Sequence, residues 1–398
     1  MIYTVMKQNP AYIQMTLEDF LYGNTEESAL FRSNYTCTRT FKSPYANQKL
    51  LEQTDIPSMI RSLYKFNRST DHIRELDRHS LYSEFFIPKK KGGLRKIDAP
   101  NQELKETLRT LKKILESFVV YKHGITGALY HTSAFAYIEG RCTVDSLKRH
   151  QANNSKWYAK YDLSNFFGST TLEYTLKMFK NVYPFSEICK GSICIPESLT
   201  RVSGENELRT ALELAFLDGG LPQGTPISPL ITNIIMIPVD HELCNTLHNY
   251  ERNTYIYTRY ADDFLVSSRY DFSPKNIETL IKDTLSKFEA PFTIKAEKTR
   301  YGSSAGKNWN LGLMINANND ITVGSKNKRR FHTMLFNYAK DYVNGIRWDL
   351  SDVQALEGLR NYYRKVEGKT IDEIVENVNK KVGCDTLNLI KSDLSIHK

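Results

Sequence analysis

The sequence lacks the marks of a disulfide-stabilised, zinc-stabilised or membrane-spanning protein. Its six cysteines include no C-x-x-C pair, which argues against a structural zinc site. The polar N-terminus predicts no signal peptide, so we expect reduced thiols and a cytoplasmic protein. The longest apolar run, around residues 230–239, is too short and too interrupted to cross a bilayer, and we expect no membrane partner.

Other patterns are missing as well. No repeat or low-complexity tract is visible, and no Ser/His/Asp arrangement typical of nucleophilic catalysis stands out. The stretch GSSAGK at 302–307 is one residue short of a phosphate-binding loop and has no Ser or Thr after its lysine. The chain therefore carries no signature of an NTPase or of a serine hydrolase.

What the chain does contain is positive charge and many aromatic side chains. Its 398 residues include 54 Lys and Arg against 45 Asp and Glu, a net charge of +9 that points to a polyanionic partner. The 24 Tyr and 19 Phe suit a protein that stacks on bases, although most of them are expected in the core. The length and the 40% apolar content allow two or three packed subdomains.

Acidic residues at the ends of predicted strands are the most informative feature. Asp262 and Asp263 lie between two strand-like runs, and Asp162 ends a third. These runs are residues 254–260, 264–268 and 156–161. A tight hairpin tip can bring adjacent carboxylates together, and three such groups make an oxygen-rich site suited to Mg²⁺. The competing interpretation is an ordinary turn, because Asp readily accepts turn geometry.

The segment between these acids favours the metal site. It reads GLPQGTPISPLITN over residues 220–233, and YADDF follows at 260–264. Together with YDLSNFF at 161–167, the order, spacing and content of these motifs resemble the reverse transcriptase family. The resemblance extends from residue 85 to residue 340.

The resemblance implies an α+β fold, the right-hand polymerase with fingers, a palm built as a split β-α-β antiparallel sheet, and a helical thumb. We expect an N-terminal extension with fingers helices over residues 1–80, fingers over 81–155 and a palm over 156–308. Part of the fingers is expected within 182–225, and a primer-grip hairpin with the thumb over 309–398.

The resemblance also assigns the chemistry. Asp162, Asp262 and Asp263 would be the catalytic acids, and together with Leu163 they would form the site of two Mg²⁺ ions, for which Mn²⁺ could substitute. Asp162 and Asp262 would bridge both ions, with Asp263 more peripheral. Two such ions about 3.5–4 Å apart activate a 3′-hydroxyl and stabilise a leaving pyrophosphate.

A second group of residues is implied to bind the incoming nucleotide. Arg95 and Lys96 of a basic fingers hairpin would hold the triphosphate, and Lys298 would lie near it. Phe167 would lie beneath the sugar and exclude a 2′-hydroxyl, while Gln223 would contact the nucleotide or the template. Each of these roles has an ordinary alternative. The hairpin could be a solvated basic turn and Lys298 an ordinary exposed lysine. Phe167 could be a core aromatic ring, and Gln223 could belong to a helix-capping loop.

The remaining implied contacts are to nucleic acid. Residues 86–113 hold nine Lys and Arg against three Asp and Glu, a net of +6 out of +9. A second basic stretch, 326–330, begins a predicted thumb helix, where cations oppose the helix dipole unless phosphate compensates them. A solvated face is the alternative for both. The residues implied are Lys91, His150, Gly224, Tyr260, Gly312, Lys328, Arg329 and Arg330.

Motif details narrow the kind of reverse transcriptase. The length suffices for fingers, palm and thumb without a nuclease domain, and QGTPISP at 223–229 resembles the retron and group II intron branch. Two stretches depart from retrons: SLKRH at 146–150 keeps only the histidine of Asn-Ala-x-x-His, and NLG at 310–312 replaces Val-Thr-Gly. Both regions bear on recognition of the partner RNA.

We therefore expect an RNA-directed DNA polymerase that copies a dedicated structured noncoding RNA in a retron or a related anti-phage defence system. Its partners would be that RNA as template and primer, the DNA product, deoxynucleoside triphosphates and an effector protein. The alternatives are an intron-like, DNA-templated or untemplated polymerase, and an RNA-binding protein on a palm fold without synthesis. The three intact acids argue against the last of these.

Periodicity and end signals predict the helices and strands. A capping box at 170–173 opens one helix, Ser273 followed by Pro274 starts another, and a Gly-Gly turn predicts a hairpin over 83–97. Residues 182–204 read as an insert-like loop. Helices are expected at 55–63, 102–118, 170–181, 206–216, 226–248, 273–288, 327–345, 351–366 and 370–381, and further short strands at 293–295, 310–313 and 321–323.

Overall fold

The computed structural model describes residues 55–88, 92–118, 130–195, 200–250, 254–304, 309 and 312–396. Packing of the backbone separates the chain into two compact units. As far as they are described, the first comprises residues 1–142, 159–266 and 273–300, and the second comprises residues 143–158, 267–272 and 301–398. Helices are combined with small sheets, which confirms the expected α+β class. The domain boundaries given above stay predictions.

Side-chain caps and leucine spacing account for two helices of the first unit. Asp55 caps α4 (Ile56–Ser69) and Asn101 caps α6 (Gln102–Ser117), each by accepting a hydrogen bond from a backbone N–H of the first turn. Four leucines of α6 lie one turn apart and are buried, so the helix packs through a single apolar stripe. The helices predicted at 55–63 and 102–118 are confirmed. Between them lie α5 (Asp71–Arg74) and a 3₁₀ turn, His79–Leu81.

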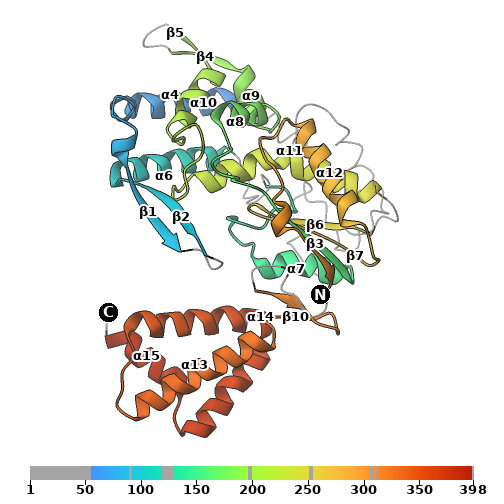
Figure 1. The fold of residues 1–398 in the computed structure, drawn as a ribbon. Helices are drawn as coiled ribbons and strands as arrows, with labels where there is room; N and C mark the ends of the chain where they lie inside the picture. Colours follow the sequence, from blue (N-terminus) through green and yellow to red (C-terminus); the bar gives the residue numbers. More distant parts are fainter. Residues whose placement is uncertain are drawn as a thin grey trace, which may run out of the picture. The chain divides into compact units, whose positions relative to one another are not determined.

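The predicted fingers hairpin is also confirmed. β1 (Tyr82–Pro88) pairs antiparallel with β2 (Leu94–Pro100) along their full lengths, and together they form the two-stranded arm drawn in blue in Figure 1. Gly92 and Gly93 have φ angles of 89° and 80°, a left-handed conformation that suits glycine. Most side chains of both strands are exposed, so the arm offers them to a ligand.

The main sheet has four strands in the order β6-β7-β3-β8, of which β3, β6 and β7 are labelled in Figure 1. The strands are β3 (Trp157–Asp162), β6 (Ile256–Tyr260), β7 (Asp263–Ser268) and β8 (Arg300–Ser303). The first three were predicted near these bounds, whereas β8 was not. Residues 293–295, predicted to be a strand, contribute one antiparallel bridge, between Leu163 and Ile294.

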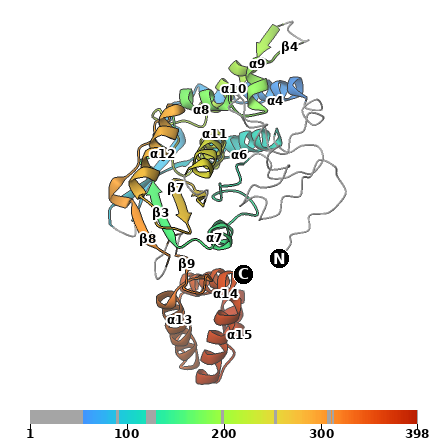
Figure 2. The same ribbon diagram turned by 90° about the vertical axis from the view of Figure 1, so that its right-hand side faces the viewer.

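The central helix of the first unit is α11 (Ser228–Asn249). Apolar residues cover nearly its whole circumference, and residues 230–241 are all buried. It packs against strand β6 and against α8 (Leu172–Phe179) and α12 (Pro274–Lys287), and Figure 2 labels the three helices. Ser273 caps α12 as predicted, by accepting a hydrogen bond from the backbone N–H of Asn276.

Two predictions for the stretch after β3 were wrong. The capping box does not form, because Thr171 rather than Thr170 caps α8 and Glu173 instead pairs with Arg209. Residues 182–204 are not a loop but contain regular elements too short for periodicity to reveal. These are α9 (Phe185–Lys190), the antiparallel pair β4 (Ser192–Ile195) and β5 (Thr200–Ser203), and the start of α10 (Gly204–Glu213).

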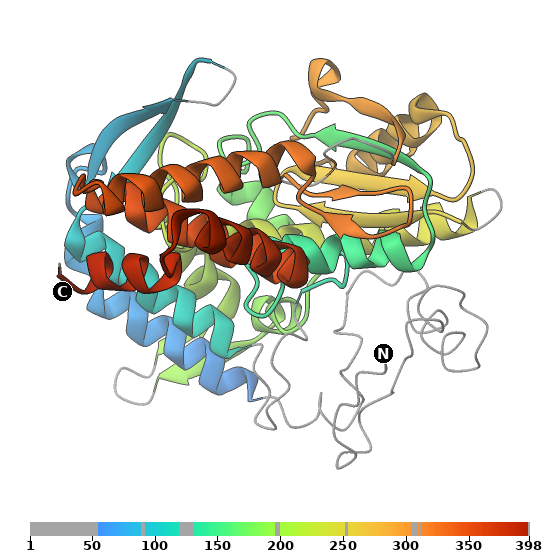
Figure 3. The same cartoon turned by 90° about the horizontal axis from the view of Figure 1, so that it is seen from below.

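The second unit is mainly helical. Its elements are α7 (Thr143–Ala152), the antiparallel pair β9 (Met314–Ile315) and β10 (Ile321–Thr322), and the helices α13 (Ser325–Val343), α14 (Leu350–Val382) and α15 (Thr386–Ile396). The last three, orange to red in Figure 3, pack against one another. In the parts of the chain that the structure describes, no helix is long and apolar enough to cross a membrane.

The predicted thumb helices agree with the observed ones in one respect and differ in another. Two helices were expected at 351–366 and 370–381, and α14 does join two helices across a kink at Glu367, which has φ −136° and ψ 61°. The carboxylate of Glu367 accepts hydrogen bonds from Thr322 and from the backbone N–H of Val323, so a tertiary contact holds the kink. The helix α15 was not predicted.

Gly204→Ala should destabilise the first unit. A Cβ at this position would lie 2.1 Å from the carbonyl oxygen of Ile188, a backbone atom that cannot easily move. We expect a loss of about 1–3 kcal/mol in the free energy of unfolding, measured in urea. Gly358→Ala is the matched control, since nothing lies within 4 Å of its added Cβ and alanine favours the helix. Equal stability of the two variants would contradict the close packing at Gly204.

Candidate active site

The turn between β6 and β7 carries two adjacent acids. It consists of Ala261 and Asp262, and Asp263 is the first residue of β7. Ala261 has a φ of 56°, in the left-handed region that non-glycine residues rarely adopt. The carbonyl of Asp262 accepts a hydrogen bond of 3.0 Å from the backbone N–H of Leu163. The turn is thereby joined to the end of β3, where Asp162 lies.

Asp162 is held by two lysines from the segment that follows α12. Lys298 Nζ lies 2.7 and 2.9 Å from the two carboxylate oxygens, and Lys295 Nζ lies 3.5 Å from one of them. The backbone N–H of Lys295 also donates to the carbonyl of Asp162, at 2.8 Å. Because Asp162 is only 7% exposed, its charge would be costly to keep without these cations.

Asp263 has a cation of its own. Lys160 Nζ lies 2.6 Å from Asp263 Oδ2, and both side chains are largely shielded from solvent. Lys160 stands two residues before Asp162 on β3, so both side chains project from the same face of the strand. The three acids therefore form one cluster with lysines from two segments.

Asp262 is the least compensated of the three acids. Burial, followed by the charges of Asp263 and Asp162, raises the pKa of its carboxyl, and Lys298 opposes this only in part. For Lys298, burial lowers the pKa, but the hydrogen bond and charge of Asp162 outweigh it and raise the pKa overall. The three carboxylates thus sense one another's charge.

The donor set suits a hard divalent cation. Among the described residues, no group of three or more His, Cys, Asp or Glu side chains is arranged to hold a metal ion as the structure stands. The ammonium groups of Lys298 and Lys160 pair with carboxylate oxygens of Asp162 and Asp263 that a metal ion would use. The raised pKa of Asp262, to which the charges of Asp263 and Asp162 contribute after burial, nevertheless fits a site at which an added cation relieves repulsion.

The two adjacent aromatic residues after Asp162 have different surroundings. Phe166 is 2% exposed, and its ring centroid lies 4.8 Å from that of Phe292. Phe167 is partly exposed, and its carbonyl accepts a hydrogen bond of 3.1 Å from the backbone N–H of Leu221. Phe167 is therefore the member of the pair that a ligand can reach, while its role beneath a sugar stays a prediction.

The loop over residues 221–224 is anchored to the fingers hairpin. The carbonyl of Gln223 accepts a hydrogen bond of 2.8 Å from the backbone N–H of Asp98, on β2. Gly224 has a φ of 126°, and a Cβ there would lie 2.9 Å from the carbonyl oxygen of Asp98. Glycine permits this close approach. The partly exposed Gln223 consequently lies beside the strand that carries the basic residues expected to bind triphosphate.

Those basic residues differ in how their charge is compensated. Lys96 Nζ lies 2.6 Å from Glu84 and 3.3 Å from Asp98, and hydrogen bonds with these two acids raise its pKa. Arg95 is exposed on the neighbouring position of β2. Arg95 is the better candidate for phosphate contact, because Lys96 would have to leave two carboxylates. Lys91 lies outside the described residues.

His150 does not lie at a surface. It is fully buried, and its Nδ1 lies 2.5 Å from Ser267 Oγ. Burial and, to a lesser extent, the charge of Arg149 lower its pKa to about 3, so the ring is neutral at physiological pH. The expected contact with nucleic acid does not fit this position, because the ring is enclosed within the second unit.

The other residues expected to contact nucleic acid are more accessible. Arg329 and Arg330 are exposed near the start of α13, whereas Lys328 Nζ pairs with Glu367 at 2.8 Å. The two arginines could therefore contact phosphate without breaking the ion pair that Lys328 makes with Glu367. Three further residues, Gly224, Tyr260 and Gly312, are exposed or partly exposed.

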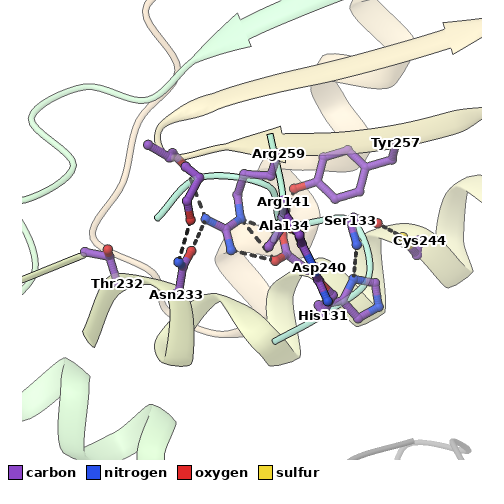
Figure 4. A network of polar contacts seen from close by, with 12 residues as sticks. His131, Ser133, Ala134, Arg141, Thr232, Asn233, Asp240, Cys244, Tyr257 and Arg259 are labelled. Carbon is purple, nitrogen blue, oxygen red and sulfur yellow. Dashed lines mark hydrogen bonds and ion pairs between the residues drawn. The ribbon is translucent and has the colours of Figure 1, made fainter. Parts of the chain in front are cut away.

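A buried polar network that was not predicted from the sequence lies behind the turn between β6 and β7 (Figure 4). Arg259 on β6 is 1% exposed, and its Nη2 lies 2.8 Å from Oδ2 of Asp240 on α11. The hydroxyl of Tyr257 donates to the same carboxylate at 2.8 Å. An acid within a helix that is apolar nearly all round was the available signal, because such an acid needs a buried partner.

Comparisons with known proteins identify relatives of this chain. A family model described as reverse transcriptase (RNA-dependent DNA polymerase) matches residues 87–332. The Retron Ec83 reverse transcriptase of Escherichia coli is 27% identical over 315 residues, which cover 78% of this chain and 89% of that protein. The Retron Ec73 reverse transcriptase of Escherichia coli is 28% identical over 313 residues, which cover 74% and 90%. These relatives confirm the expected resemblance to the retron branch.

Similarity to solved structures is weaker. A structure of truncated apo telomerase from Candida tropicalis is 15% identical, with a TM-score of 0.42. The matched region covers 62% of this chain and 56% of the telomerase chain.

Asp262→Asn should stabilise the metal-free protein while abolishing DNA synthesis. Folding raises the pKa of Asp262, so its ionised form destabilises the fold at neutral pH, and this penalty disappears once low pH protonates the carboxyl. We expect a higher Tm for the variant at pH 7, which corresponds to a gain on the order of 1 kcal/mol or less in the free energy of unfolding. The increase in Tm should be smaller at acidic pH.

Asp162→Asn is the matched comparison for Asp262→Asn. It should lower Tm, because it removes the carboxylate that pairs with Lys298. Added Mg²⁺ should raise the Tm of the wild type more than that of either variant, since ligands that bind the folded state stabilise it. A lower Tm of Asp262→Asn at pH 7, or retained synthesis, would contradict the assignment.

Phe167→Ala should admit ribonucleotides, because it removes bulk at a ligand-accessible position without touching the acids. The measurement is the ratio of kcat/KM for deoxyribonucleotides to that for ribonucleotides. Phe166→Ala is the control; we expect it to cost about 3–5 kcal/mol of stability, as loss of a core ring does, and to leave the ratio unchanged. An unchanged ratio in Phe167→Ala would assign the sugar selection to another group.

Proposed function

The chain belongs to the reverse transcriptase family of RNA-dependent DNA polymerases, and we propose that it copies a dedicated structured noncoding RNA into DNA in a retron or a related anti-phage defence system. That RNA would serve as template and primer, and deoxynucleoside triphosphates would be the substrates. The protein would act in the cytoplasm together with an effector protein. Support comes from relatives that are named retron reverse transcriptases and that span most of the chain.

The observation that carries the proposal is the cluster of Asp162, Asp262 and Asp263 at the ends of neighbouring strands. A palm fold that only bound RNA would have no need for three mutually repelling acids. Their mutual repulsion lowers stability, and their negative charge repels phosphate. Retention of all three therefore favours synthesis over binding alone.

Asp162, Asp262, Asp263 and Leu163 would hold two Mg²⁺ ions. When bound, two such ions activate the 3′-hydroxyl and stabilise the leaving pyrophosphate. Lys298 would move from Asp162 to the triphosphate, which its long flexible side chain allows. Lys160 would keep Asp263 oriented.

The incoming nucleotide would be bound between the fingers hairpin and the palm residues of the first unit. Arg95, exposed on β2, would contact the triphosphate, and Phe167 would contact the sugar. Gln223 is positioned to contact the nucleotide or template, because its carbonyl anchors it beside the same strand. These groups bind and orient the substrate, and correct orientation accounts for much of catalysis in phosphoryl transfer.

The RNA would be held mainly through phosphates by the basic hairpin and by Arg329 and Arg330. Affinity should therefore fall steeply as salt concentration rises, because each phosphate contact releases counterions. Specificity should come from RNA shape and unpaired bases, since the major groove of an A-form helix is closed to side chains.

The test is to sequence the nucleic acid that copurifies with the protein and to measure its affinity over a range of salt concentrations. We expect one structured RNA, bound more tightly than bulk cellular RNA and extended with deoxynucleotides. The double variant Asp262→Asn/Asp263→Asn is the control, and should bind the same RNA without extending it. Random cellular RNA in the preparation, with equal affinity for a structured RNA encoded beside the gene, would contradict a dedicated template.

A further inference from the structure

The buried network behind the catalytic turn centres on one guanidinium group. Arg259 Nε donates to both carboxylate oxygens of Asp240, at 2.9 and 3.0 Å, and Nη2 donates to Oδ2 at 2.8 Å. The remaining nitrogen, Nη1, donates to Asn233 Oδ1 at 3.2 Å and to the carbonyl oxygen of Ala261 at 3.3 Å. The guanidinium therefore connects helix α11 with the turn that carries Asp262 (Figure 4).

The contact with Ala261 falls on a strained residue. Ala261 is in the left-handed region, φ 56°, where its Cβ crowds the following carbonyl oxygen. A non-glycine residue stays in that region only when its surroundings impose it. The Arg259 hydrogen bond to the Ala261 carbonyl is such a constraint, and the next residue along the chain is Asp262.

A second branch of the network reaches another left-handed residue. Asn233 Nδ2 donates to the carbonyl of Ala136 at 2.8 Å, immediately before Tyr137, which has a φ of 61° and is 57% exposed. The same network thus contacts two backbone carbonyls, that of the left-handed Ala261 and the one that precedes the left-handed Tyr137.

We propose that Arg259 is a positioning residue for DNA synthesis: fixed by Asp240, it holds the carbonyl of Ala261 and so sets the turn that presents Asp262. This inference rests on the proposed function, since it assumes that Asp262 acts in synthesis. Stability alone would not require the pair, because apolar residues of similar volume commonly replace a buried ion pair without loss. A guanidinium is required because its planar fork bonds Asp240, Asn233 and Ala261 at the same time.

The test is Arg259→Lys, which keeps the positive charge near Asp240 but loses the fork. We expect kcat to fall about 10²-fold, as small displacements of reacting groups do, with RNA affinity and the KM for deoxynucleotides within about twofold. Tyr257→Phe is the matched control. It removes a buried hydrogen bond to Asp240 but leaves the contact with Ala261, and kcat should not change.

The decisive variant is Ala261→Gly in the Arg259→Lys background. Glycine adopts the left-handed turn without strain, so it should restore about tenfold of the lost kcat, whereas a general loss of stability would not be rescued. Should Arg259→Lys fail to fold, the double variant Asp240→Asn/Arg259→Gln leaves no unpaired buried charge and should show the same loss and the same rescue. Thermal unfolding of every variant separates positioning from stability.

Kinetics should be measured on a poly(rA)/oligo(dT) template, so that the result does not depend on the natural RNA. Unchanged kcat in Arg259→Lys, or a loss that follows Tm and is not relieved by Ala261→Gly, would overturn the positioning role. Failure to find a dedicated RNA would contradict the proposed function but would leave this result intact.

Discussion

Repulsion among three carboxylates at the ends of neighbouring strands is the constraint on which the first unit depends. Asp162, Asp262 and Asp263 can be ionised together only if cations lie close by. In the structure those cations are lysines, Lys160 on the same strand as Asp162 and Lys298 from the segment after α12. If metal ions bind, their positive charge would have to replace at least part of the charge compensation that these lysines provide.

A second constraint is the close approach of backbones around this cluster. A Cβ on Gly220 would lie 2.2 Å from the carbonyl oxygen of Gly168, and one on Gly224 would lie 2.9 Å from that of Asp98. These glycines bring the loop after α10 against both the segment of Phe167 and the fingers hairpin. The groups proposed to bind nucleotide are therefore collected by backbone contacts, which hold position better than flexible side chains do.

The site also carries costs that a protein selected only for stability would avoid. Asp262 has a raised pKa, Ala261 is left-handed, and Arg259 with Asp240 forms an ion pair that is almost fully buried. Unfavourable local features of this kind collect where function requires a fixed geometry. The apolar surroundings of α11 offset them, because that helix buries nearly all of its surface.

Local signals in the sequence were sufficient for much of the fold. The fingers hairpin and its Gly-Gly turn, the cap Ser273, and the strands that flank the three acids depend on neighbouring residues, so pattern predicts them. The elements within 182–204 and helix α15 were not predicted. These elements are short, and packing rather than periodicity stabilises them.

The sequence by itself determined the family, because the motifs that identify it and their order lie in contiguous segments. Only the tertiary structure decided how those segments are paired. Lys160 and Lys298 meet acids that lie 103 and 136 residues away, and His150 is enclosed rather than exposed. Phe167, not Phe166, is accessible to a ligand. Such outcomes depend on which side chains pack together in the folded chain, and no local sequence pattern specifies that packing.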